Sequence, residues 1–131
     1  SFKQELLQGL HDLDGHTLKM ALFTSSATLG ATTTAYSTTN ESSGTGYTAG
    51  GATLANVAVS LSGTTAFVDF DNVSFTSATI SDAAGALIYN SSASNRAIAV
   101  IDFGATKSVS SGTLTITLPT ASATTALIRV S

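Results

Sequence analysis

The stretch Thr113-Leu114-Thr115-Ile116-Thr117-Leu118 decides the fold, because large apolar residues alternate strictly with threonines. Successive side chains of a β-strand point to opposite faces, so this period of two predicts a strand with one apolar face and one threonine face. Pro119 follows and closes the strand, since proline cannot donate a hydrogen bond to a β-ladder. The preceding Ser110-Ser111-Gly112 is predicted to be a turn.

Similar apolar runs recur along the chain and predict further strands. They are Thr17–Leu22, Val57–Leu61, Ala66–Phe70, Ala84–Asn90, Arg96–Phe103 and Thr125–Val130. The polar stretches Ser62-Gly63-Thr64 and Asn90–Asn95 separate neighbouring strands and predict chain reversals, the second as a hairpin. About six to eight short strands with turns between them predict a mainly β fold, an antiparallel β-sandwich or barrel.

One helix is predicted, at the N-terminal end over Phe2–Leu13. Phe2, Leu6 and Leu10 recur at helical spacing, and Asp14-Gly15 is predicted to end the helix because glycine commonly follows a helix C-terminus. The apolar stripe of so short a helix must dock on something. It packs either on the sheet of its own domain or on a neighbouring subunit, so these three residues are candidate partner contacts.

The segment Thr24–Gly51 is rich in Ser, Thr, Gly and Ala and has no periodicity. Long irregular loops inside a compact domain tend to be functional. Tyr36 and Tyr47 are candidate anchors for a partner protein, because tyrosine offers a large contact area at low entropic cost. The alternative is a surface loop whose tyrosines cap the local core.

These elements predict a single β domain. It consists of an N-terminal helix (residues 1–14), a long Ser/Thr/Gly-rich loop or arm (24–51) and the core strands (52–131).

Composition restricts the partners of this domain. Only 10% of the 131 residues are charged, against about 25% in an ordinary soluble domain. A surface built from small neutral residues suits close contact with other protein. The net charge of -3 and five scattered basic residues argue against nucleic acid, and the longest apolar run, Ala97–Ile101, is too short for a membrane helix. The absence of cysteine favours folding in the cytoplasm.

No catalytic, cofactor-binding or metal-binding residue is predicted, and the chain is not expected to be an enzyme. Four potential metal ligands gather near the predicted end of the helix: His11, Asp12, Asp14 and His16. They straddle a helix stop and a glycine, so capping or solvated roles are expected instead. Asp69 and Asp71 lack the glycine-containing loop and distal glutamate of a calcium site.

Several phrases of the sequence carry a family resemblance. They are Leu18–Leu29, Thr33–Tyr36, Gly44–Gly51, Gly85–Ser91 and Asn95–Gly104. Together they resemble small virion proteins of tailed bacteriophages, most of all capsid decoration (cement) proteins. The resemblance implies a structural protein that is made in the host cytoplasm and resides in the virion. There it would bind and stabilise the capsid by clamping neighbouring major capsid subunits.

The resemblance also implies a homo-oligomer, with a trimer at local threefold positions as one arrangement. A tail or head–tail joining protein is the rival placement within the particle.

A carbohydrate-binding or adhesin-like β-sandwich module is an alternative of a different class. Such modules need an aromatic platform, but the chain has no tryptophan, and its only aromatic residues outside the expected core positions are Tyr36, Tyr47 and Tyr89. Titration with glycans separates the two interpretations.

Overall fold

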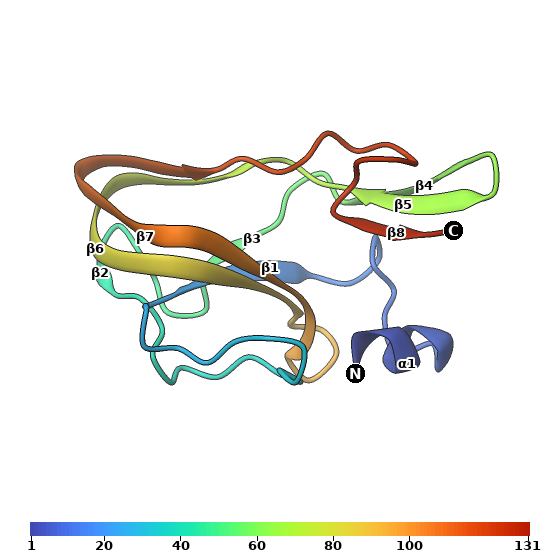
Figure 1. The fold of residues 1–131 in the computed structure, drawn as a ribbon, viewed down its shortest axis with the longest axis horizontal. Coiled ribbons are helices and arrows are strands. Elements are labelled where there is room, and N and C mark those ends of the chain that lie inside the picture. The colour runs from blue at the N-terminus through green and yellow to red at the C-terminus, as the bar shows by residue number, and fades with distance from the viewer.

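The computed structural model describes residues 1–131 and contains two antiparallel β-sheets and one short helix (Figure 1). In chain order the elements are α1 (Phe2–Leu7), β1 (Leu18–Phe23), β2 (Gly44–Thr45), β3 (Ala52–Thr53), β4 (Ala58–Ser62), β5 (Thr65–Asp69), β6 (Val73–Asn90), β7 (Arg96–Ile116) and β8 (Ile128–Val130). The predicted mainly β, antiparallel fold is confirmed, and neither sheet closes on itself. The helix, six residues long, is far too short to cross a membrane.

The larger sheet is organised around β6, its longest inner strand. β7 pairs with one edge of β6, β1 and β2 pair with the other, and β3 pairs with the far side of β1. The register of β1 on β6 runs from Leu18 opposite Asn90 to Phe23 opposite Gly85. All but one of the β1 residues are buried, so this strand lies at the centre of the fold.

The β6–β7 ribbon bends back on itself part-way along its length, as Figure 1 shows at the left of the view. Four register shifts fall between Phe75 and Gly85, and such bulges bend a strand pair. The predicted turn at Ser110-Ser111-Gly112 is wrong, because these residues lie inside β7. Ser111, with φ 49°, belongs to one of the bulges, so it kinks the strand without reversing the chain.

The smaller sheet has the order β4-β5-β8 and one apolar face. Val59 lies opposite Val68, which lies opposite Ile128; Leu61 lies opposite Ala66, which lies opposite Val130. Residues two apart in a strand share a face, so all six side chains lie on the same side.

The two sheets share one hydrophobic core. Its buried cluster joins Val68 and Ile128 of the smaller sheet to Leu18, Ile88 and Ile98 of the larger one. Only the inner half of the apolar face of the smaller sheet takes part, since Val68 is 5% exposed and Val130 is 55% exposed.

The helix is shorter than the predicted Phe2–Leu13, because Gly9 ends it. Gly9 has φ +72°, a left-handed conformation that glycine adopts without steric cost. The N–H of Leu10 donates to Glu5 O and the N–H of Gly9 donates to Leu6 O, which together form a Schellman motif. Leu10 and Leu13 therefore lie beyond the helix, and the stop expected at Gly15 comes six residues too late.

The segment 24–51 is a loop fastened to the domain at several points. Ser42 N donates to Leu22 O, and Ala97 N donates to Thr34 O. β2 adds a short strand to β6. These contacts tie both halves of the segment to the larger sheet.

Candidate functional site

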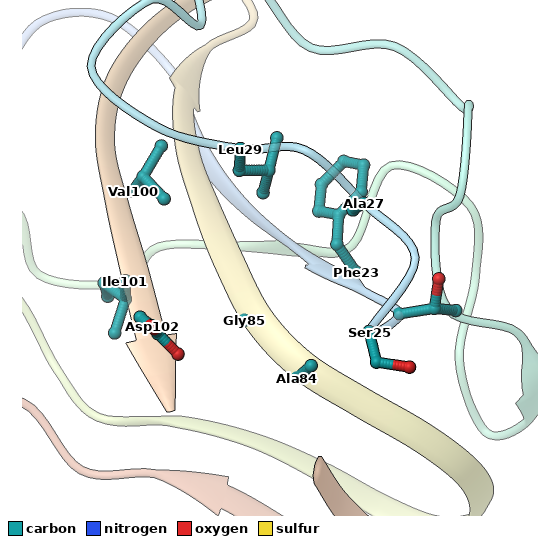
Figure 2. Close-up of a pocket in the computed structure, with 10 residues that line it drawn as sticks. Phe23, Ser25, Ala27, Leu29, Ala84, Gly85, Val100, Ile101 and Asp102 are labelled. Carbon is teal, nitrogen blue, oxygen red and sulfur yellow. The ribbon is translucent and has the colours of Figure 1, made fainter. Parts of the chain in front are cut away.

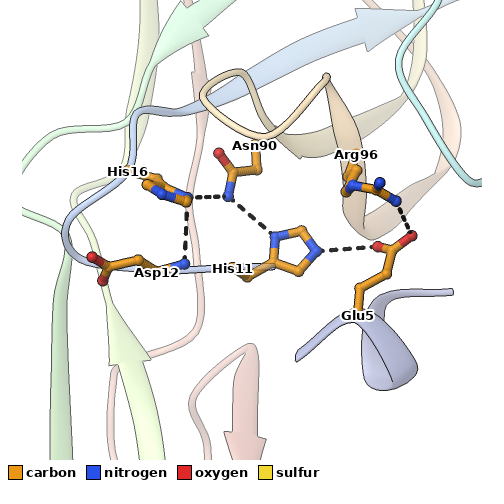
Figure 3. A network of polar contacts seen from close by, with 6 residues as sticks. All are labelled: Glu5, His11, Asp12, His16, Asn90 and Arg96. Carbon is orange, nitrogen blue, oxygen red and sulfur yellow. Dashed lines mark hydrogen bonds and ion pairs between the residues drawn. The ribbon is translucent and has the colours of Figure 1, made fainter. Parts of the chain in front are cut away.

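A buried polar network docks α1 on the β6–β7 hairpin (Figure 3). Asn90 Nδ2 donates to His11 Nδ1 at 3.1 Å, so His11 carries its proton on Nε2 and donates it to Glu5 Oε2 at 3.1 Å. Arg96 Nη1 donates to the other Glu5 oxygen at 2.9 Å. Glu5, His11 and Asn90 are all buried, so the helix is positioned by specific polar contacts.

The charge on Glu5 is stabilised by these donors. Burial alone would raise its pKa, but the hydrogen bonds from His11 and Arg96, with the charge of Arg96, outweigh burial and lower the pKa below the ordinary glutamate value. Glu5 is therefore ionised at neutral pH. Glu5 of α1 and Arg96 at the start of β7 thus form an ion pair.

The four potential metal ligands near the end of the predicted helix have other roles. His16 Nδ1, like that of His11, accepts from Asn90 Nδ2, in this case at 2.9 Å. Asp12 Oδ1 accepts from Gly15 N, and Asp14 Oδ2 accepts from Val59 N at 3.3 Å. No three histidine or acidic side chains converge on one point.

Tyr36 and Tyr47, the predicted anchors, converge on Glu41. Tyr36 Oη donates to one carboxylate oxygen at 2.7 Å, while Tyr47 Oη and Gly50 N donate to the other at 2.6 and 2.7 Å. Burial, reinforced by Glu41, raises the pKa of both phenols well above the usual range. Tyr36 also stacks on Tyr89, with ring centroids 4.5 Å apart. This arrangement, the Glu41 cluster, folds the 24–51 loop onto the larger sheet.

A shallow pocket of about 240 Å³ lies between the 24–29 segment, β6 and β7 (Figure 2). Asp102 is the one titratable residue in its lining, and its Oδ1 accepts from Gly104 N at 2.8 Å. General acid–base or nucleophilic chemistry needs a second group within hydrogen-bond reach of the first. Thr24 and Ser25 line the same pocket, but neither hydroxyl is hydrogen-bonded to Asp102, and Ser25 Oγ donates to Asp82 Oδ2 at 3.0 Å instead.

The exposed apolar surface gathers on the smaller sheet and α1. Leu7 is 91% exposed, Leu61 72%, Val130 55% and Val59 45%. Val59, Leu61 and Val130 share one sheet face, and Leu7 and Val130 line the same groove of about 470 Å³ between α1 and β8. We call Leu7, Val59, Leu61 and Val130 the contact face. The elements that carry these residues, α1, β4 and β8, lie at the right of the view in Figure 1.

The three helix residues predicted as partner contacts, Phe2, Leu6 and Leu10, are not part of the contact face. Phe2 and Leu6 are half-buried and pack against the core, and Phe2 meets the ring of His11 edge-on at 5.2 Å. Leu10 is 37% exposed beyond the end of the helix. Leu7 points outward instead, so the helix serves its own core with one side and presents one leucine to solvent.

The sequence interpretation missed the sheet half of the contact face. Val59 and Leu61 alternate with small residues, a pattern that predicts a strand but does not tell whether its apolar side chains face the core or the solvent.

Comparison with protein-family models found no match, and none was found among the curated proteins or the solved structures.

Proposed function

We propose that this chain is a structural protein of a tailed-phage particle, a decoration protein that stabilises the capsid by clamping neighbouring major capsid subunits. The observation that carries the proposal is the contact face: three large aliphatic side chains extend the apolar face of the smaller sheet beyond the core, and Leu7 of α1 lines the same groove as Val130. Contiguous exposed apolar surface in a small domain marks a site of protein contact.

The composition supports the same proposal. With 10% charged residues, the surface has few groups whose desolvation would oppose close packing against another subunit. The two sheets sharing one core form, in this proposal, an open β-sandwich that serves as a rigid support for the contact face. Binding only to the assembled shell stabilises that state by mass action.

The rival interpretations fit the geometry less well. A carbohydrate platform needs an exposed aromatic face, whereas Tyr89 is 2% exposed and Tyr36 stacks on it. An enzyme needs convergent reactive groups, whereas Asp102 and Ser25 line one pocket without a hydrogen bond between them. A tail or head–tail joining protein would use the same contact face on a different partner.

The test is cosedimentation with shells assembled from the major capsid protein encoded in the same genome, prepared without this chain. The wild type is expected to pellet with the shells at a fixed stoichiometry. Val130→Lys places a charge in the contact face and is expected to weaken binding by about tenfold or more. Ser108→Lys, an exposed change in the middle of β7, is the matched control and is expected to bind like the wild type.

Two results contradict the proposal. One is wild-type protein that stays in the supernatant at all concentrations. The other is equal binding by Val130→Lys and the wild type.

A further inference from the structure

β4 is an open edge of the smaller sheet, since β5 pairs with only one side of it. The N–H of Val59 donates to Asp14 Oδ2, so it points away from β5. Alternate residues of a strand direct their backbone groups to the same side. Val59 and Leu61 therefore present their N–H and C=O groups to the open edge.

This edge lacks most of the features that protect sheet edges from pairing. Natural edge strands carry charges, prolines or bulges that block a second chain. β7, the other long edge, carries Asp102 and Lys107 and several bulges. β4 has a regular five-residue register with β5 and no charge or proline of its own. The carboxylate of Asp14 is the one group of the chain that occupies it.

We propose that a second copy of this chain adds antiparallel to β4, with Ser60 facing Ser60 across a two-fold axis. In this register Val59 of each copy lies opposite Leu61 of the other, so both hydrogen-bond through their outward-facing backbone groups. The same register places the two exposed aliphatic side chains side by side on one face. The strand is thus complementary to itself, as a two-fold interface requires.

Charge favours a second copy over a charged partner. The chain from Ala52 to Val68 contains no charged residue, so two copies meet there without repulsion between like charges. For the same reason the edge has no charge that would attract a strongly acidic or basic strand of another protein. Asp14 is the exception and must leave Val59 N before the second strand pairs. Its exposed hydrogen bond of 3.3 Å is long, so Asp14 acts as a weak cap on the edge.

The pairing deepens the proposed function, on which its biological role rests, because a two-fold dimer carries two contact faces and bridges two capsid subunits. It also differs from the trimer that the family resemblance implies. A threefold contact joins two different surfaces, whereas β4 pairing joins the same surface twice and closes at two copies.

The test is sedimentation velocity of the purified full chain over a wide concentration range, without shells. The wild type is expected to pass from 13.1 kDa to twice that mass as its concentration rises. Leu61→Lys removes two Leu61–Val59 cross-strand contacts and brings two like charges to the new strand pair, so it is expected to weaken association by about tenfold or more. Val130→Lys is the control, because Val130 lies on the same face but on β8, two strands away, and is expected to dimerise like the wild type.

Asp14→Ala removes the cap and is expected to dimerise at about one third of the wild-type concentration or less. A monomer at every concentration, a trimer, or a Leu61→Lys variant that dimerises as tightly as the wild type overturns the pairing. Unchanged or weaker association of Asp14→Ala overturns the role of Asp14 as a cap on this edge. Circular dichroism establishes that each variant is folded, which is expected because Leu61 is 72% exposed.

The sedimentation experiment tests the dimer and the shell-binding experiment tests the proposed function, so the two can fail independently. A monomer that still pellets with shells overturns the dimer and leaves the proposed function standing. A dimer that does not bind the shells supports the pairing and contradicts the decoration role.

Discussion

Replacing Glu41 with alanine tests how the 24–51 loop is held. The carboxylate accepts three hydrogen bonds, from Tyr36, Tyr47 and Gly50. A hydrogen bond to a charged group contributes about 1.5–3 kcal/mol when buried, and Glu41 is half-buried, so we take about 1 kcal/mol for each. Glu41→Ala is therefore expected to lower the free energy of unfolding by about 3 kcal/mol, which lowers the melting temperature by about 10 °C.

Chemical denaturation measures the loss, and Glu41→Gln is the matched control. Glutamine keeps the shape but offers one acceptor oxygen, so its amide nitrogen meets one of the donors. We expect Glu41→Gln to lose about half as much stability as Glu41→Ala. A change of less than about 0.5 kcal/mol in Glu41→Ala, the usual effect of a neutral surface substitution, would refute the role of the cluster.

Tyrosine titration gives an independent result for the same cluster. The pKa of each of the three tyrosines, Tyr36, Tyr47 and Tyr89, is raised above the usual value near 10. Groups with a raised pKa stabilise the fold fully below the pKa of the unfolded chain, so stability is expected to fall as pH rises above about 10. Phenolate absorbance is expected to appear only with alkaline unfolding. A tyrosine that titrates near pH 10 in the folded protein contradicts the geometry.

Three further predictions concern the helix and the central strand. Gly9→Ala is expected to cost about 1 kcal/mol in denaturant unfolding, since Gly9 has φ +72° and open space where the methyl group would lie; an unchanged midpoint contradicts the Schellman stop. Gly51→Ala is expected to destabilise by more than about 3 kcal/mol, because its Cβ would lie 1.8 Å from Met20 O; a folded, equally stable variant refutes that close approach. Because the pKa of Glu5 is lowered on folding, its stabilisation is present above the unfolded value near 4.3 and is lost as pH falls through the folded value. Glu5→Gln is expected to flatten acid unfolding in that range, and an identical acid profile argues against the paired charge.

The sequence predicts β1, β4 and β5 well, because apolar residues recur at every second position in each of them, as Leu18, Met20 and Leu22 do in β1. The first half of β6 escaped prediction for a physical reason. Val73 and Phe75 are buried in one phase and Ala78 and Ile80 in the other, since a bulge between them shifts the alternation by one residue. Period-based reasoning does not detect a strand whose phase changes within it.

The helix and the sites show a second limit. Gly9 interrupts an apolar stripe that otherwise continues to Leu13, and the stripe outweighed a single glycine in the sequence interpretation. The role of Glu41 was missed although it is the one acidic residue between two tyrosines of an otherwise uncharged segment. Whether the apolar face of a strand packs on the core or faces a partner depends on where the smaller sheet extends past the core. The pattern of a single strand does not contain this information, because it is set by the packing of the two sheets.

The most direct test of the central claim is the thermal disruption of capsid shells with and without this chain. A protein that binds only the assembled shell stabilises it by about 2.7 kcal/mol per site at a concentration one hundred times its dissociation constant. Saturating wild-type protein is expected to raise the disruption temperature of the shells, and Val130→Lys at the same concentration is expected to raise it less. An unchanged disruption temperature in the presence of saturating wild-type protein would contradict the claim.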